Sequence, residues 1–307
     1  MSDPLNSNGV YMDMPTFYQP MVEALIMSMG VVAQAQGETS LGIDQKNEAK
    51  LDGTNVTVTD GKSEEAAIVC LGGLPVFAEE RGLVNNPHPR YEILIDPLDG
   101  TRPFLNGAPT STVIMALYDK VDKQVVGCFV GEPVSGRVWH YMPGMDSTRV
   151  GYVAFNGEEL AIMSQVPVSV FTGDLGPKIT VYSDFYPGFT KKGSHSFSNE
   201  EQAKLFEMIF GKVSAISMLG SNAIHHALVA MGNKHDVAGA ITTCLGGAWD
   251  VAPVILVEKA GGAVRGFTRV DGVWEEQSPL DIKAHHFTIS GNSRKTVDTL
   301  SNILTSI

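Results

Sequence analysis

The sequence predicts a layered protein of the mixed α/β class. Segments with apolar residues at helical spacing alternate with short apolar runs that are typical of strands. Two of these runs, LPVFA and YEILI, end in acidic residues. With 307 residues, 43% of them apolar, the chain can bury a full core in one large domain or in two closely joined ones.

The first predicted element is a long amphipathic helix. Apolar positions recur at helical spacing over residues 14–36, with Pro15 near the start and Gly37 just past the end. The alternating VTVT run at residues 56–59 predicts a strand, and a second helix is expected over about residues 63–71. Asp60 is therefore expected near a strand-to-helix junction.

The next strands are expected to deliver acidic side chains to loops. LPVFA leads to Glu79 and Glu80, and YEILI leads to Asp96. The segments STVIMALYD and QVVGCFVGEPVSGRVWHYM favour sheet, with EPVSG as a hairpin turn. The turn FNG marks a predicted division between an N-terminal metal- and phosphate-binding α+β half, residues 1–155, and a C-terminal α/β half that completes the active site, residues 156–307.

The C-terminal half alternates again between strands and helices. The predicted strands are KITVYSD and KVSAISM. The predicted helices are NEEQAKLFEMIF, SNAIHHALVAMG and one that begins at Trp249-Asp250 and stops at Gly261-Gly262. Because the sequence contains no internal repeat and no low-complexity linker, we expect the halves to share an interface as one compact unit.

Charge and cysteine content narrow the classes of function. The 34 acidic and 22 basic side chains give a net charge of -12, which disfavours a nucleic-acid polymer as partner and favours divalent cations. The three cysteines, Cys70, Cys128 and Cys244, have no CxxC spacing, which indicates reduced thiols in a cytoplasmic protein. The N-terminus is polar and no apolar run approaches the ~20 residues of a membrane helix, so no membrane partner is expected.

The densest chemical signal is ILIDPLDGTRPFLNG, residues 93–107. An apolar strand ends there in two aspartates three positions apart, Asp96 and Asp99. This geometry can direct both carboxylates and the carbonyl of Leu98 at one point. Free backbone N–H groups that could face an anion come next in the chain, at Gly100 and Thr101. A cation and a phosphate could then share one site.

Each acidic residue also has a simpler interpretation. Asp-Pro and Asp-Gly are common turn dipeptides. Asp250 could be only the N-cap of the helix VAPVILVEKA, and Glu79 and Glu80 could be solvated loop charges. The joint occurrence of these residues favours a cation site. The pair His225-His226, by contrast, lies on a predicted helix whose side chains diverge by about 100° per residue, so packing or surface roles are favoured over metal binding.

The segments FAEE, DPLDGT and WDVAPVILVEKAGG, in this order, resemble the signature segments of the inositol monophosphatase family. That family belongs to the lithium-sensitive, Mg²⁺-dependent phosphatases, together with fructose-1,6-bisphosphatase and bisphosphate nucleotidases. VTVTD, VAFNG, LGSNAIHHALVAMG and ISGN extend the resemblance nearly end to end. The resemblance implies an α/β/α/β/α sandwich and a homodimer, which is common in the family.

The resemblance also implies a set of cation ligands. Two Mg²⁺ ions are expected, with a third, weaker one near Glu79 or Glu80. The first ion would be held by Glu79, Asp96 and the Leu98 carbonyl, and the second by Asp96, Asp99 and Asp250. Four carboxylates supply enough negative charge for two such ions, and ligation by oxygen alone selects Mg²⁺ over zinc.

Further residues are implied in catalysis and substrate binding. Thr101 and Asp60 resemble the pair that orients and deprotonates the nucleophilic water, and Glu79 is expected to take part in catalysis from the metal site. The expected phosphate and substrate contacts are Gly100, Thr101, Arg102, Ser221 and Asn222. Arg102 either binds a second anionic group or is a solvated surface arginine.

The expected function is Mg²⁺-dependent hydrolysis of a small phosphate monoester, an inositol-phosphate-like polyol or a sugar phosphate, by metal-activated water. Arg102 and Pro103 depart from the inositol-type pattern after DGT, which leaves a 3'(2'),5'-bisphosphate nucleotidase and a histidinol-phosphate phosphatase as alternatives. A non-catalytic ligand-binding relative is the alternative from another class. A structural Ca²⁺-binding protein is disfavoured because no EF-hand-like loop is present.

Overall fold

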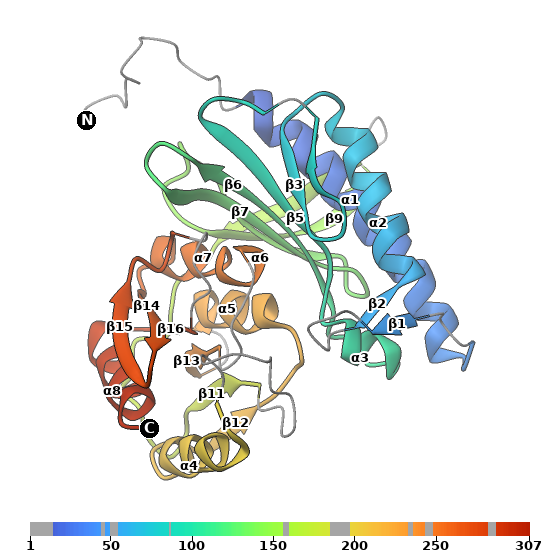
Figure 1. Ribbon diagram of the computed structural model, residues 1–307. Coiled ribbons are helices and arrows are strands. Elements are labelled where there is room, and N and C mark those ends of the chain that lie inside the picture. Colours follow the sequence, from blue (N-terminus) through green and yellow to red (C-terminus); the bar gives the residue numbers. More distant parts are fainter. Residues whose placement is uncertain are drawn as a thin grey trace.

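The computed structural model describes residues 15–43, 47–49, 55–85, 87–155, 160–184, 197–232, 236–242, 248–281 and 287–307. Within these residues the strands form three sheets (Figure 1). A two-stranded sheet has the order β1-β2, an eight-stranded sheet has the order β10-β9-β8-β7-β6-β5-β3-β4, and a six-stranded sheet has the order β12-β11-β13-β16-β14-β15.

The bounds of the elements are as follows. The strands are β1 (Asn47–Ala49), β2 (Asn55–Thr57), β3 (Val76–Ala78), β4 (Gly82–Val84), β5 (Tyr91–Asp99), β6 (Thr112–Asp119), β7 (Gln124–Glu132), β8 (Arg137–Tyr141), β9 (Arg149–Phe155), β10 (Leu160–Pro167), β11 (Thr180–Ser183), β12 (Ala215–Ser217), β13 (Val237–Ile241), β14 (Ala263–Val270), β15 (Val273–Gln277) and β16 (Phe287–Gly291). The helices are α1 (Pro15–Ser40), α2 (Val58–Leu71), α3 (Thr101–Leu105), α4 (Asn199–Phe210), α5 (Asn222–Ala230), α6 (Ala248–Val251), α7 (Val254–Lys259) and α8 (Arg294–Thr305).

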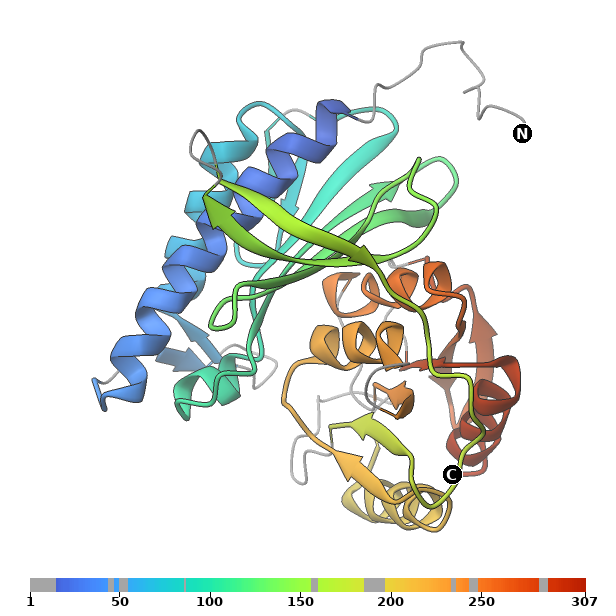
Figure 2. The same ribbon diagram turned by 180° about the vertical axis from the view of Figure 1, so that it is seen from behind.

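Helices and the two large sheets alternate as layers (Figures 1 and 2). Helices α1 and α2 cover one face of the eight-stranded sheet, α5, α6 and α7 lie between the two large sheets, and α4 and α8 cover the outer face of the six-stranded sheet. This order of layers confirms the α/β/α/β/α sandwich expected from the sequence.

Strand β5 shows why the sequence folds into these layers. Its residues alternate between two cores: Ile93 and Ile95 pack in the cluster with α1 and α2, whereas Leu94 packs in the cluster with α5 and α7. A strand buried on both faces carries a continuous apolar run, which here is ILI, residues 93–95. Helix α6 contacts β5, so the middle layer lies against the strand that carries the two aspartates.

Strand β10 belongs to the eight-stranded sheet, where it pairs antiparallel with β9 at one edge. The next strand, β11, belongs to the six-stranded sheet, so the chain passes from one large sheet to the other after Pro167. The division of the chain at residues 155 and 156 stays a prediction. The predicted hairpin at EPVSG is confirmed, since Glu132 and Arg137 are paired across it.

The first two helices differ from their predicted bounds. Helix α1 continues through Gly37 to Ser40, where the hydroxyls of Thr39 and Ser40 donate to carbonyls one turn earlier. Helix α2 begins at Val58, because Thr57 and Asp60 form a capping box at its N-terminus. Asp60 thus lies in the first turn of α2.

Two further expectations from the sequence concern free cysteines and membrane-spanning helices. Cys70 and Cys128 are free, whereas Cys244 lies outside the described residues. Burial raises the pKa of the Cys128 thiol. Among the helices of the described ranges, none has the length and apolar character needed to cross a membrane.

Candidate active site

The centre of the site is the irregular end of β5. The pairing of β5 with β6 shifts register between Asp96 and Asp99, so that the strand bulges where the two aspartates lie. The N–H of Leu98 donates to Asp96 Oδ1 at 2.9 Å within this bulge. Both carboxylates are held in the interior, with exposed fractions of 4% for Asp96 and 7% for Asp99.

A third aspartate joins them from the C-terminal part of the chain. Asp250 lies in the short helix α6, and one carboxylate oxygen from each of Asp96, Asp99 and Asp250 lies within 4.8 Å of the others. The ring of Trp249, next to Asp250, stacks on Phe77 of β3 at a centroid distance of 5.8 Å. Three of the predicted cation ligands are therefore brought together.

The electrostatics of this cluster favour a bound cation. Burial, followed by the charges of Glu79, Asp99 and Asp250, raises the pKa of Asp96 well above its usual value. Burial and the charge of Asp250 raise the pKa of Asp99 to about 7, although three hydrogen bonds to Asp99 act in the opposite direction. A divalent cation would offset this repulsion, and a donor set made only of oxygen atoms fits a hard cation such as Mg²⁺.

Glu79 and Glu80 lie in the loop after β3. The N–H of Glu79 donates to the carbonyl of Ile95 at 3.1 Å, and the Glu79 charge acts on Asp96. The N–H of Glu80 donates to Oε2 of Glu64, a buried residue of α2, at 2.9 Å. The loop is thus attached on one side to β5 and on the other to α2. A role of Glu80 at a third ion stays a prediction.

Asp60 is held at the start of α2, beside the DPLDGT segment. Its Oδ2 accepts hydrogen bonds from the N–H and the hydroxyl of Thr57 at 2.7 and 2.6 Å. The hydroxyl of Ser63, one turn further along, donates to the carbonyl of Pro97 at 2.9 Å. Helix α3, which begins with Thr101, contacts β2, the strand that ends at Thr57. The elements that carry Asp60 and Thr101 are therefore adjacent.

The remaining predicted substrate residues divide into two groups. The hydroxyl of Thr101 donates to the Leu98 carbonyl at 3.3 Å, and Arg102 is exposed. Ser221 and Asn222, in contrast, bond to the carboxylate cluster: Ser221 Oγ donates to Asp99 Oδ2 at 2.6 Å, and Asn222 Nδ2 donates to Asp250 Oδ1 at 3.3 Å. Phosphate contacts by Gly100, Thr101, Arg102, Ser221 and Asn222 stay predictions.

The structure adds supporting residues that sequence reasoning missed. Thr57 could have been found, because the pattern Thr-x-x-Asp at the start of a helix is that of a capping box. Thr112 and Glu64 gave no such signal, since their bonds to Asp99 and to the N–H of Glu80 join distant segments. The two adjacent histidines, His225 and His226, are buried, which confirms the packing role favoured from the sequence.

Three convergent aspartates, two of them buried, lie where β5 meets the middle helical layer of an α/β sandwich and form a candidate cation site. Residues 13–303 match the inositol monophosphatase family, and the chain therefore belongs to this family. Membership supports phosphatase activity on phosphate monoesters.

Individual relatives agree with this assignment. The inositol-1-monophosphatase of Mesorhizobium japonicum is 28% identical over 259 residues, which are 80% of this chain and 86% of that protein. The bifunctional phosphatase IMPL2, chloroplastic, of Arabidopsis thaliana is also 28% identical over 80% of this chain, but the match spans 64% of that longer protein. The crystal structure of the extragenic suppressor protein suhB from Bartonella henselae shares the fold, with a TM-score of 0.70 at 20% identity over 94% of this chain and 98% of that chain.

Proposed function

We propose that this chain hydrolyses a small phosphate monoester, of the inositol-phosphate or sugar-phosphate type, with Mg²⁺ as cofactor. The observation that carries the proposal is the convergence of half-buried Asp250 with buried Asp96 and Asp99 in a fold of the inositol monophosphatase family. Such crowded carboxylates are costly unless a cation or protons neutralise them, and strongly raised pKa values are typical of functional sites.

The expected cation ligands are the three aspartates, Glu79 and the carbonyl of Leu98, with Glu80 beside a third ion. When bound, Mg²⁺ would neutralise the phosphoryl group, lower the pKa of the attacking water and stabilise the departing alkoxide. The acidic cluster itself would repel a phosphate dianion. These carboxylates would therefore allow substrate to bind only when cations are bound to them.

The other residues act on the substrate and on the attacking water. Asp60, fixed by its two bonds from Thr57, would accept the proton of the water, and the hydroxyl of Thr101 would orient that water. The N–H groups of Gly100 and Thr101 would hold phosphoryl oxygens. Support for these roles comes from the family resemblance and from the contact between α3 and β2.

Arg102 favours a second candidate within the same reaction class. It is exposed and directly follows Thr101, so a substrate with a second anionic group could reach it. Bisphosphate nucleotides, sugar bisphosphates and histidinol phosphate therefore belong in the substrate panel. Lithium sensitivity, a homodimer and a cytoplasmic location are further parts of the proposal, which rest on the family resemblance and the cysteine pattern.

The proposal predicts the effect of removing one carboxylate charge. Asp96→Asn and Asp250→Asn should each lower Mg²⁺-dependent phosphate release about 10²–10³-fold or more. Each substitution removes a negative charge that would hold Mg²⁺, and the bound ion would stabilise the transition state. Phosphate release is measured on inositol monophosphate, fructose 1,6-bisphosphate, adenosine 3',5'-bisphosphate and histidinol phosphate, with and without Mg²⁺ and Li⁺. Asp146→Asn is the matched control, since Asp146 is an exposed surface carboxylate.

Two results would contradict the proposal. Substantial activity in both folded variants would remove the assigned role of the carboxylates. A wild-type protein that binds Mg²⁺ and releases no phosphate from any substrate of the panel would instead indicate a non-catalytic relative.

A further inference from the structure

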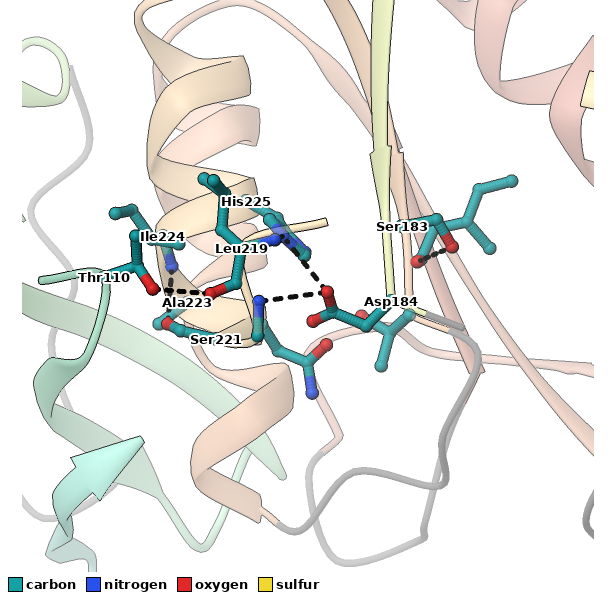
Figure 3. Close-up of polar contacts among 12 residues, drawn as sticks. Thr110, Ser183, Asp184, Leu219, Ser221, Ala223, Ile224 and His225 are labelled. Carbon is teal, nitrogen blue, oxygen red and sulfur yellow. Dashed lines mark hydrogen bonds and ion pairs between the residues drawn. The ribbon is translucent and has the colours of Figure 1, made fainter. Parts of the chain in front are cut away.

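The segment of residues 219–222, which leads into α5, has the backbone N–H groups of its first two residues bonded to protein atoms (Figure 3). The N–H of Leu219 donates to His225 Nε2 at 3.1 Å, and the N–H of Gly220 donates to Asp184 Oδ1 at 3.0 Å. The carbonyl of Leu219 accepts a bond from the Thr110 hydroxyl at 2.6 Å. This segment is therefore fixed to the turn before β6, to the residue after β11 and to α5, and these two N–H groups do not face a ligand.

The next residue of the segment, Ser221, contacts the cation site. Its hydroxyl donates to Asp99 Oδ2 at 2.6 Å. The same oxygen of Asp99 accepts the N–H of Ala223 at 2.9 Å and the Thr112 hydroxyl at 3.1 Å. Because a carboxylate oxygen accepts about two strong hydrogen bonds, Oδ2 is fully used. Oδ1 of Asp99 is therefore the oxygen left for a cation.

Close packing fixes the segment against the end of β5. A Cβ added to Gly100 would lie 2.9 Å from the carbonyl oxygen of Gly220, and a Cβ added to Gly220 would lie 2.8 Å from Cγ of Pro103. Ser221 is also buried, with 1% of its surface exposed. The bond from Ser221 to Asp99 is therefore made in a setting with little freedom to adjust.

Asn222, which follows in the chain, contacts a second member of the cluster. Its Nδ2 donates to Asp250 Oδ1 at 3.3 Å. Two adjacent side chains thus hold two carboxylates that reach the site from different elements, Asp99 from β5 and Asp250 from α6.

We propose that Ser221 and Asn222 are positioning residues of the cation site: Ser221 holds Oδ2 of Asp99 and Asn222 holds Oδ1 of Asp250, so that the remaining oxygens face the cations. The inference rests on the proposed function and deepens it. Removing a group that orients a metal ligand typically lowers metal affinity about 10–100-fold. Direct contact with the substrate is not required for this role.

The main difficulty for a test is that Ser221 also caps α5. Its Oγ accepts the N–H of Ile224 at 3.2 Å. Ser293 provides a matched control, because it caps α8 by accepting the N–H of Thr296 at the same distance of 3.2 Å and lies outside the carboxylate cluster. Ser293→Ala removes a cap and a bond to the Thr296 hydroxyl, whereas Ser221→Ala removes a cap, a contact with the Thr112 hydroxyl and the donor to Asp99.

The experiment measures Mg²⁺ affinity by calorimetry without substrate, together with the midpoint of thermal unfolding and the values of kcat and KM. Ser221→Ala should weaken Mg²⁺ binding about 10–100-fold and lower kcat/KM. Ser293→Ala should lower the unfolding midpoint with unchanged Mg²⁺ affinity. Asn222→Ala, which leaves the Ser221 cap in place, should also weaken Mg²⁺ binding.

The outcomes separate the two proposals. If the wild-type protein binds Mg²⁺ and neither Ser221→Ala nor Asn222→Ala weakens that binding, the positioning role is wrong and the proposed function stands. A failure of Ser221→Ala to fold leaves Asn222→Ala to decide the question. If the wild-type protein neither binds Mg²⁺ nor releases phosphate, the proposed function fails, and the positioning role fails with it.

Discussion

Gly220 allows the 219–222 segment to pack closely against Pro103. Its φ of +79° lies in the left-handed region, which side chains with a Cβ adopt at a cost. Its α-carbon also lies so close to Pro103 that an added Cβ would be 2.8 and 2.9 Å from two ring carbons. Glycine at this position therefore meets a backbone requirement and a packing requirement at once.

Substitution of this glycine by alanine should violate both the backbone and the packing requirement. Gly220→Ala should destabilise the protein by about 1–2 kcal/mol from the left-handed backbone and by about 1–3 kcal/mol more from overpacking. It should also lower kcat/KM, because the 219–222 segment must move away from the cation site. The free energy of unfolding by urea and the rate of phosphate release measure these effects.

Gly272 is the matched control for this change. Its φ is +81° and no atom lies within 4 Å of an added Cβ, so Gly272→Ala carries the backbone cost without the overpacking. Equal destabilisation by the two substitutions, with unchanged kcat/KM in both, would show that the contact with Pro103 has no effect.

Among the elements, helix α2 holds several residues of the site in place. Thr57 at its N-cap holds Asp60, Ser63 bonds to the carbonyl of Pro97, and Glu64 accepts the N–H of Glu80. Residues of one helix thus hold Asp60 and reach two other segments of the site. Burial raises the pKa of the Glu64 carboxyl, while the bond from Glu80 and the nearby Arg81 lower it.

The capping box of α2 has a counterpart that allows a controlled test. Thr57→Ala should cost about 0.5–2 kcal/mol of stability through the lost cap. It should also lower kcat, because Asp60 loses the hydroxyl that bonds to its Oδ2 at 2.6 Å. Ser198→Ala removes the same type of cap from α4, where Ser198 and Glu201 form a capping box. Urea unfolding should show similar losses of stability in Thr57→Ala and Ser198→Ala, and steady-state kinetics should show a loss of kcat only in Thr57→Ala. Equal kcat values in the two variants would contradict the assigned role of Asp60.

The same helix shows how far element prediction from sequence can go. The Thr-x-x-Asp pattern places the start of α2 at Val58, but apolar periodicity alone placed the start at Ser63. The end of α1 could not be predicted from Gly37, because the helix continues on backbone bonds that a glycine leaves intact. Strand β5 was predicted from its apolar run, whereas its bulge depends on pairing with β6.

In the molecule as a whole, the site depends on contacts between the two large sheets and the helices between them. The acidic residues could be predicted from sequence, because strands and a helix start deliver them in a recognisable order. Their supports could not, since Ser221 meets Asp99 and Phe77 meets Trp249 only after distant segments pack. No local pattern encodes such pairs, so the sequence indicated the ligands but not what holds them.

The middle layer is also attached to the second sheet by a buried histidine. His226 of α5 bonds through Nδ1 to the hydroxyl of Ser290 in β16 at 2.8 Å, and through Nε2 to the hydroxyl of Thr242 at 3.2 Å. Burial, followed by the nearby His225, lowers the pKa of His226 to about 3. The folded protein therefore holds this ring neutral at pH values where the unfolded chain, with a pKa of about 6.5, takes up a proton.

This difference predicts how stability depends on pH. The unfolded state binds more protons between pH 6.5 and 3, so the contribution of His226 is absent above about pH 6.5 and destabilises the fold by up to about 1.4 kcal/mol per pH unit below it. His226→Asn should be less stable than wild type at pH 7.5, through lost packing, but should lose stability more slowly as pH falls. Urea unfolding at pH 7.5, 6.0 and 5.0 with chelator measures both proteins. Because the site carboxylates titrate in both, their difference isolates His226; a difference in unfolding free energy that stays constant from pH 7.5 to 5.0 would show that the ring does not titrate in this way.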